Sequence, residues 1–293
     1  MTDTSFTQAL LQPGKGAIPY TDVAYPDHPL TLNTYRASGY RPDQPIVIVQ
    51  HGILRNGDEY RDFWVDAAEQ HQLLIVAPTF SDAHWPGVEA YNDGRVFEHG
   101  TIRPVDTWTY SILPRLIRRL QAEGITTREK VYLFGHSAGG QFVHRLMSSQ
   151  THDLFEAVAC GNSGWYTLPT LDAPFPEGLA GVGLDQGHLT RLLAYPLKVM
   201  AGDRDNNATD FHLPRTPAAL RQGPERFARA HNYFEVGKQA AEKLGVPFNW
   251  TLQVVPGVGH DGRTMSAVAA SLWFEGKMLA TEKIAALVSQ HVA

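Results

Sequence analysis

The sequence predicts an α/β protein with a mostly parallel central sheet and helices on both of its faces. Strand-like segments alternate with helix-like segments along the 293 residues, as they do when a parallel sheet is covered on both sides. Several of the strand segments are continuous apolar runs, which are typical of strands buried on both faces. One such run, at residues 131–134, stops at a glycine-rich turn, and a helix pattern begins directly after it.

The expected elements follow one another along the chain. Residues 1–28 are interrupted by proline and glycine, so we expect an irregular lead-in with a first edge strand near residues 16–22. Residues 29–36 alternate between apolar and polar, which predicts a strand with one wet face. The other predicted strands are residues 45–50, 73–78, 131–134, 154–161, 197–201 and 248–255. The predicted helices are residues 60–72, 107–123, 141–147, 225–244, 263–277 and 281–291, with Asp106 as the expected N-cap of the second.

The chain shows no internal repeat, low-complexity tract or linker, so we expect a single domain over residues 1–293. Three long segments lack a clear periodic pattern and are rich in glycine, proline and aspartate. These segments, residues 79–104, 162–195 and 206–222, are predicted to be loops around the active site.

Composition and charge exclude several classes of function. The net charge is −5 and no basic stripe is visible, so neither nucleic acid nor an anionic membrane is an expected partner. No apolar run approaches the roughly 20 residues of a membrane helix. The N-terminus has no basic or apolar signal segment, so we expect a cytoplasmic protein, or a secreted one if a leader has been lost. The oligomeric state stays open.

The sequence also argues against metal and cofactor chemistry. Cys160 is the only cysteine; it cannot form an internal disulfide and is expected to be buried after an apolar run. There is no His-Glu-x-x-His motif or cysteine pair for zinc, and no Gly-x-Gly-x-x-Gly opens a helix for a dinucleotide. We therefore expect no metal and no cofactor.

The glycine-rich turn carries the chemistry. It contains the pentapeptide Gly135-His136-Ser137-Ala138-Gly139 between an apolar strand and a helix, which is typical of a serine lifted clear of a sheet on a sharp turn. Small residues at both ends let the strand and helix backbones approach each other. The helix N-terminus favours negative charge that develops beside Ser137.

A nucleophilic serine needs a histidine as base and a carboxylate to orient it, and the chain supplies both after late strands. His260 follows the last predicted strand. Asp203 and Asp205 follow the strand that ends at residue 201. The Gly-x-x-Asp spacing from Gly202 favours Asp205 as the orienting acid, while Asp203 is expected to hold the loop through backbone N–H groups.

An oxyanion needs two preorganised N–H donors. The backbone of Ala138, directly after the nucleophile, is one expected donor. The second is the N–H of Ile53, in the His51-Gly52-Ile53 turn after an early buried strand.

On these residues the chain resembles the α/β-hydrolase-fold serine esterases, and within them the polyhydroxybutyrate-depolymerase-like branch. The resemblance spans residues 30–290 and implies that Trp165 and Tyr166, after Gly164, lie near the substrate. Secreted polymer-degrading relatives carry a signal peptide, disulfides and often an extra domain. None of these is visible here, so a small soluble ester is the expected substrate. The matching motifs are His51-Gly52, residues 127–132, residues 135–140 and Val258-Gly259-His260.

We therefore expect a serine hydrolase that cleaves carboxylic esters through an acyl-enzyme on Ser137, with His260 as base and Asp205 as orienting acid. Three alternatives stay open. The same residues serve a peptidase or amidase, or an acyltransferase with an acceptor other than water. The non-enzymatic alternative is a ligand-binding protein built on a hydrolase fold.

Overall fold

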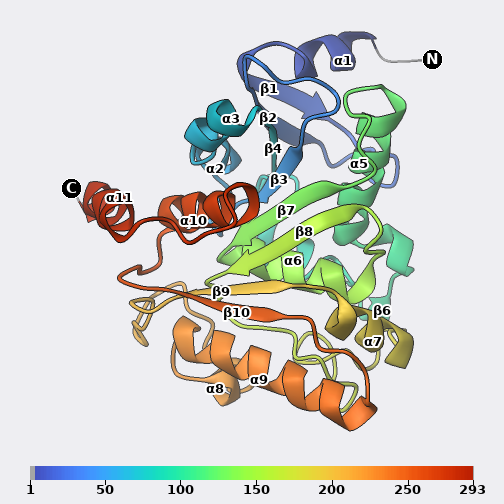
Figure 1. Ribbon diagram of the computed structural model, residues 1–293. Helices are drawn as coiled ribbons and strands as arrows, with labels where there is room; N and C mark the ends of the chain where they lie inside the picture. Colours follow the sequence, from blue (N-terminus) through green and yellow to red (C-terminus); the bar gives the residue numbers. More distant parts are fainter. Residues whose placement is uncertain (1–3, 293) are drawn as a thin grey trace.

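The computed structural model describes residues 4–292 and has an eight-stranded sheet at its centre (Figure 1). The strands lie in the order β1-β2-β4-β3-β7-β8-β9-β10. β2 is antiparallel to both of its neighbours, and all pairs from β4 to β10 are parallel. The predicted α/β class with a mostly parallel sheet is confirmed. The strands are β1 Gly14–Tyr20, β2 Leu30–Arg36, β3 Ile46–Gln50, β4 Leu74–Thr79, β7 Val131–His136, β8 Phe155–Gly161, β9 Lys198–Gly202 and β10 Thr251–Val255.

Helices cover both faces of this sheet (Figure 1). One face carries α2 Gly57–Asp62, α3 Val65–His71 and α10 Gly262–Phe274, with α11 Thr281–Val292 beyond them. The other face carries α5 Ile112–Ala122, α6 Ala138–Ser149 and α9 Arg226–Leu244. No helix in the described part of the chain is long and apolar enough to cross a membrane.

The core lies between the sheet and these helices. Every residue of β3 is buried, as the continuous apolar run of that strand predicts. Apolar side chains of α5 recur at helical spacing, and Ile112, Leu116 and Leu120 are fully buried on one face. α6 is buried along its whole length, including its polar residues Gln141 and Arg145. Buried polar groups need hydrogen-bond partners, so the polar side chains of α6 must be paired inside the protein.

The structure corrects several expected element boundaries. The lead-in is not irregular, because it contains α1 Thr4–Leu10 and β1, and Phe6 and Leu10 are buried. The predicted helix at 60–72 is two helices, since the fully buried Trp64 interrupts it between α2 and α3. Asp106 is not an N-cap of α5; residues 105–111 form two 3-10 turns, and α5 begins at Ile112.

The three predicted loops also contain short elements. Residues 79–104 hold α4 Gly87–Ala90 and the small hairpin of β5 Phe97–Glu98 with β6 Thr101–Ile102. Residues 162–195 contain α7 Gln186–Ala194, which begins with a capping box between Asp185 and His188. Residues 206–222 contain α8 Pro217–Gln222, capped by Thr216. Both caps are readable in the sequence and signal helix starts.

Candidate active site

Ser137 lies on a sharp turn between β7 and α6. Its φ of 59° and ψ of −121° are rare for a residue with a side chain. Gly135 and Gly139 are needed because of close approach: a Cβ on Gly135 would clash with the carbonyl of Gly139, and one on Gly139 with the carbonyl of Gln50 on β3. The unusual backbone angles thus fall on the serine itself, and the glycines provide space around it.

The structure brings Ser137, His260 and Asp205 into one hydrogen-bonded line. His260 Nε2 is 3.0 Å from Ser137 Oγ, and its Nδ1 is 2.7 Å from Asp205 Oδ2. Asp205 is buried, whereas 28% of the His260 side chain is exposed. This line joins the ends of β7, β9 and β10, because parallel strands bring their carboxyl ends to the same edge of a sheet.

The two candidate aspartates have different partners. Asp205 contacts His260, while Asp203 Oδ1 accepts a hydrogen bond from the Gly257 backbone N–H at 2.7 Å. The second oxygen of Asp205 accepts from Arg226 Nη1 at 3.3 Å, and that nitrogen also donates to Asp210 Oδ2 at 2.8 Å. Arg226 is almost fully buried. Sequence reasoning missed Arg226, whose contact with Asp205 depends on the tertiary fold.

A buried asparagine joins the loops that carry the acid and the base. Asn162 follows β8, and its Oδ1 accepts from the Gly202 N–H at 2.9 Å at the end of β9. Its Nδ2 donates to the carbonyl of Gly259 at 2.9 Å, beside His260. Asn162 has a positive φ of 45°, a conformation that asparagine tolerates better than most residues. No motif in the sequence marks this residue.

His136 packs against the site without joining the line. Its Nδ1 is 2.8 Å from the hydroxyl of Tyr60, and its ring centroid is 4.6 Å from that of His260. Burial raises the pKa of Tyr60, so the phenol stays neutral. These contacts give His136 a role in packing and hydrogen bonding beside the site.

The expected oxyanion residues both lie beside Ser137. Ala138 is the first residue of α6, and Ile53 lines the same cavity wall as the serine. His51 anchors the turn before Ile53: its Nε2 accepts from the Phe80 N–H at 3.0 Å, and its carbonyl accepts from the Tyr91 hydroxyl at 2.7 Å. Burial lowers the pKa of His51 to about 3, so its ring is a neutral acceptor.

Two cavities meet at the nucleophile. The larger one has a volume of about 630 Å³ and the smaller one about 290 Å³. Ser137, Ile53 and His212 line both of them. His260 lines only the smaller cavity, and Ala138 only the larger one. An ester bound with its carbonyl at Ser137 therefore has room for a separate group on each side.

The aromatic residues expected near the substrate divide between two environments. Trp165 lines the larger cavity. The expectation for Tyr166 needs correction, because this ring is fully buried and stacks on Tyr233 with centroids 4.4 Å apart. Of these two adjacent residues, only Trp165 lines the cavity.

Other features of the chain lie apart from this site. Cys160 is fully buried, as expected, and burial raises its pKa to about 12. Residues 4–292 contain no group of His, Cys, Asp and Glu side chains that could hold a metal ion.

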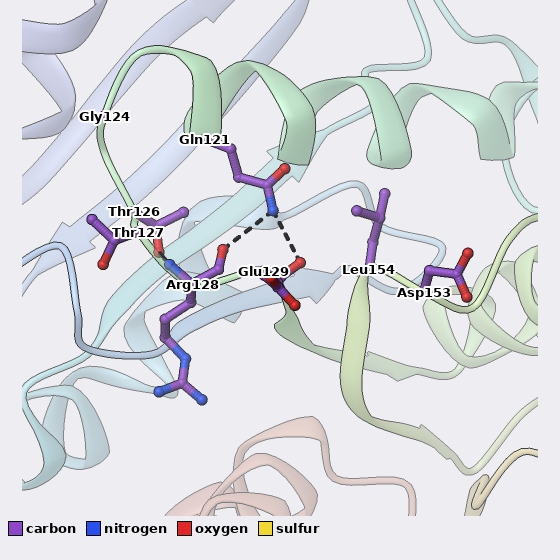
Figure 2. A pocket seen from close by; sticks show the side chains of 8 residues that line it. All are labelled: Gln121, Gly124, Thr126, Thr127, Arg128, Glu129, Asp153 and Leu154. Atoms are coloured by element: carbon purple, nitrogen blue, oxygen red, sulfur yellow. Dashed lines mark hydrogen bonds between the residues drawn. The ribbon is translucent and has the colours of Figure 1, made fainter.

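A hollow of about 520 Å³ lies before β7 and β8, at the end of the sheet opposite Ser137 (Figure 2). There Gln121 donates to the carbonyls of Arg128 and Glu129 at 3.2 and 3.0 Å. None of its eight lining residues is a serine, cysteine or histidine. The lining of the hollow therefore provides no serine or cysteine nucleophile and no histidine base of the kind that Ser137 and His260 provide.

The sheet order, the sharp turn at Ser137 and the late-strand positions of the acid and base define an α/β-hydrolase fold. The chain is 59% identical to the poly(3-hydroxybutyrate) depolymerase LpqC from Bordetella parapertussis, with 96% of this chain and 97% of that one covered and a TM-score of 0.93. It is 31% identical to poly(aspartic acid) hydrolase-1 from Sphingomonas sp. KT-1, with 89% and 99% covered and a TM-score of 0.86.

An S-formylglutathione hydrolase from Agrobacterium tumefaciens, at 15% identity, 91% and 95% coverage and a TM-score of 0.57, shares the fold. Comparisons with protein-family models and with curated protein sequences gave no match. The chain belongs to the α/β-hydrolase-fold esterases, in the polyhydroxybutyrate-depolymerase-like branch.

Proposed function

We propose that the protein hydrolyses carboxylic esters through an acyl-enzyme on Ser137. The observation that carries this proposal is the hydrogen-bonded line from Ser137 Oγ through His260 to Asp205, at the junction of two cavities. Ser137 attacks the ester carbonyl while His260 Nε2 takes the hydroxyl proton. The N–H groups of Ala138 and Ile53 receive the oxyanion.

The intermediate then collapses in two balanced steps. His260 gives its proton to the ester oxygen, the carbon–oxygen bond breaks, and the alcohol leaves. Water attacks the acyl-enzyme after losing a proton to His260, and the acid departs as Ser137 regains its proton. Asp205 holds Nδ1 of His260 protonated throughout, which leaves Nε2 free to accept.

The two cavities divide the ester between them. The leaving oxygen must lie next to His260, which lines only the smaller cavity. The alcohol part therefore occupies the 290 Å³ cavity, and the acyl part occupies the 630 Å³ cavity beside Ala138 and Trp165. This division suits an ester whose acyl part is larger than its alcohol part.

Amide hydrolysis is the second candidate function. The 31% identity to a poly(aspartic acid) hydrolase favours it, since amino acids polymerise through amide bonds and the same three residues cleave amides. The relative at 59% identity is a poly(3-hydroxybutyrate) depolymerase, and this places ester hydrolysis first.

The test is hydrolysis of p-nitrophenyl esters from acetate to palmitate, with Ser137→Ala as the control. We expect turnover of short and medium acyl chains that Ser137→Ala abolishes, together with labelling of Ser137 by a fluorophosphonate. Turnover of amino-acid p-nitroanilides without ester turnover would favour the second candidate. Folded protein that shows neither turnover nor labelling would refute both.

A further inference from the structure

A second histidine lies against the catalytic base. The ring centroids of His136 and His260 are 4.6 Å apart, and the two rings are inclined by 36°. His136 is the last residue of β7 and is buried, so the strand holds its ring beside the base. In the proposed reaction His260 carries an extra proton after each attack on the carbonyl. Two positive rings at this distance would repel each other, so the reaction needs His136 to stay neutral.

The Tyr60 hydroxyl determines where His136 carries its proton. The phenol oxygen is 2.8 Å from His136 Nδ1. Burial, together with the charges of Asp261 and Glu59, raises the pKa of Tyr60, so the hydroxyl keeps its proton. The phenol oxygen also accepts a hydrogen bond from the Gly52 backbone. Among the described residues, the hydroxyl proton therefore has His136 Nδ1 as its acceptor, and a neutral imidazole then carries its own proton on Nε2.

The packing around this hydrogen bond disfavours a second proton on His136. A proton on Nδ1 would set two donors against each other, because the Tyr60 hydroxyl already donates to that nitrogen. A Cβ on Gly262 would lie 3.0 Å from the Tyr60 oxygen and 3.2 Å from His136 Nδ1, so the Gly262 backbone packs directly on the hydrogen bond. Gly262 is the first residue of α10, and the positive end of a helix disfavours a positive charge beside it.

The groups that can carry charge around the two rings come from several elements. They are Glu59 and Tyr60 on α2, Asp205, Asp210 and His212 on the segment after β9, Arg226 on α9, and Asp261 and Arg263 at the start of α10. Burial keeps two further neighbours uncharged, because it lowers the pKa of His51 to about 3 and raises that of Cys160 to about 12. Carboxylates outnumber guanidinium groups in this set, so the surroundings favour a proton on one of the two stacked histidines.

We propose that Tyr60 directs this proton to the base: its hydroxyl keeps His136 neutral, so that the proton taken from Ser137 is held by His260 alone. Tyr60 acts through His136 and is therefore a positioning residue, while Ser137, His260 and Asp205 perform the reaction. This inference rests on the proposed ester hydrolysis and adds a residue to its mechanism.

The test is the pH dependence of kcat/KM for a p-nitrophenyl ester, with p-nitrophenol release read at its pH-independent wavelength. Without the Tyr60 hydroxyl, His136 becomes a second place for the proton, and protein that carries the proton there is inactive. We therefore expect Tyr60→Phe to move the midpoint of the acid limb to higher pH by about 1 unit, the size of one hydrogen bond. A purely structural role would lower the rate at every pH and leave the midpoint in place.

His136→Phe is the partner variant, because its ring packs on His260 and takes no proton. In this background Tyr60→Phe should not move the midpoint. His136→Phe alone should show the midpoint of the unchanged protein, whatever its rate, because His136 is neutral there; this tests the proposal even when Tyr60→Phe does not fold. His136→Gln also takes no proton and is a second variant of this kind. Tyr35→Phe removes a hydroxyl that bonds Glu69 on α3 and should leave the midpoint unchanged.

The outcomes separate the two proposals. Absence of Ser137-dependent turnover at every pH sinks the proposed function and this inference with it. Where such turnover is present, an unmoved or lowered midpoint in folded Tyr60→Phe overturns the inference alone. A shift that persists in the His136→Phe background overturns it too. The same holds when the midpoint of His136→Phe alone lies more than about half a unit below that of the unchanged protein, since His136 would then take the proton itself.

Discussion

Replacing Asp205 with asparagine should abolish most of the activity without moving the site, and the reason lies in Arg226. Arg226 Nη1 donates to Asp205 Oδ1, so the asparagine must keep its oxygen on that side. Its NH₂ group then faces His260 Nδ1, where Asp205 Oδ2 lies at 2.7 Å. Two donors cannot share a hydrogen bond, so Nδ1 becomes the acceptor and the ring proton moves to Nε2. His260 then presents an N–H to Ser137 Oγ and cannot take its proton.

A wrong tautomer of this kind lowers turnover by on the order of 10⁴ in the serine protease triad, or about 5.4 kcal/mol of transition-state stabilisation. We expect a loss of similar size for Asp205→Asn in kcat of p-nitrophenyl ester hydrolysis. Asp203→Asn is the matched control, because an asparagine oxygen still accepts from the Gly257 N–H. Its activity should stay within about threefold of the unchanged protein, a difference of well under 1 kcal/mol.

Two further measurements make this prediction strict. Circular dichroism checks that Asp205→Asn is folded. Fluorophosphonate labelling of Ser137 checks that the variant reacts more slowly but keeps its site. A loss below about 100-fold for Asp205→Asn would refute the tautomer argument. A larger loss for Asp203→Asn than for Asp205→Asn would assign the orienting role to the other aspartate.

Three other predictions follow from buried groups. Gly139→Ala should lower the free energy of unfolding by about 3 kcal/mol or more in urea titrations, because the new Cβ would strike the carbonyl of Gln50; an unchanged midpoint contradicts the close packing of α6 on β3. Cys160, whose pKa burial raises to about 12, should resist iodoacetamide at pH 8 until the protein unfolds, and rapid labelling of native protein would contradict this. Burial lowers the pKa of His51 to about 3 and that of His144 well below its usual value. The unfolded chain therefore binds more protons below pH 6.5, and stability should fall with decreasing pH by on the order of 1 kcal/mol per unit for each histidine; equal urea midpoints at pH 7 and pH 5 would contradict it.

The sequence reveals the central sheet because its strands are signalled locally. The apolar runs of β3, β4 and β7 are long enough to be recognised without knowledge of their neighbours. The short elements cannot be predicted from the sequence where tertiary packing determines them. Phe63 and Trp64 separate α2 from α3, with the Trp64 ring fully buried in the core, and no local propensity marks that break.

The same distinction applies to the site. Ser137, Asp205 and His260 are recognisable because each follows a strand, and the parallel sheet then brings them into contact. No sequence motif marks Arg226 or Asn162, since each contacts residues that are distant along the chain. The sequence does not predict the position of Tyr166, because the direction of a side chain in a loop depends on what packs against it, here Tyr233.

Asn162 has a consequence for how this protein can change. Its amide adds a side-chain link to the backbone hydrogen bonds that already join the ends of β9 and β10, from the Asp203 N–H to Val255 and from the Arg204 N–H to Val258. All of these bonds involve residues outside the 206–222 segment. Segments such as residues 206–222, which border the substrate cavities, are thereby free to be lengthened, shortened or exchanged. Substrate range and catalytic alignment can evolve separately in this scaffold, and the same separation is open to a protein engineer who leaves residue 162 untouched.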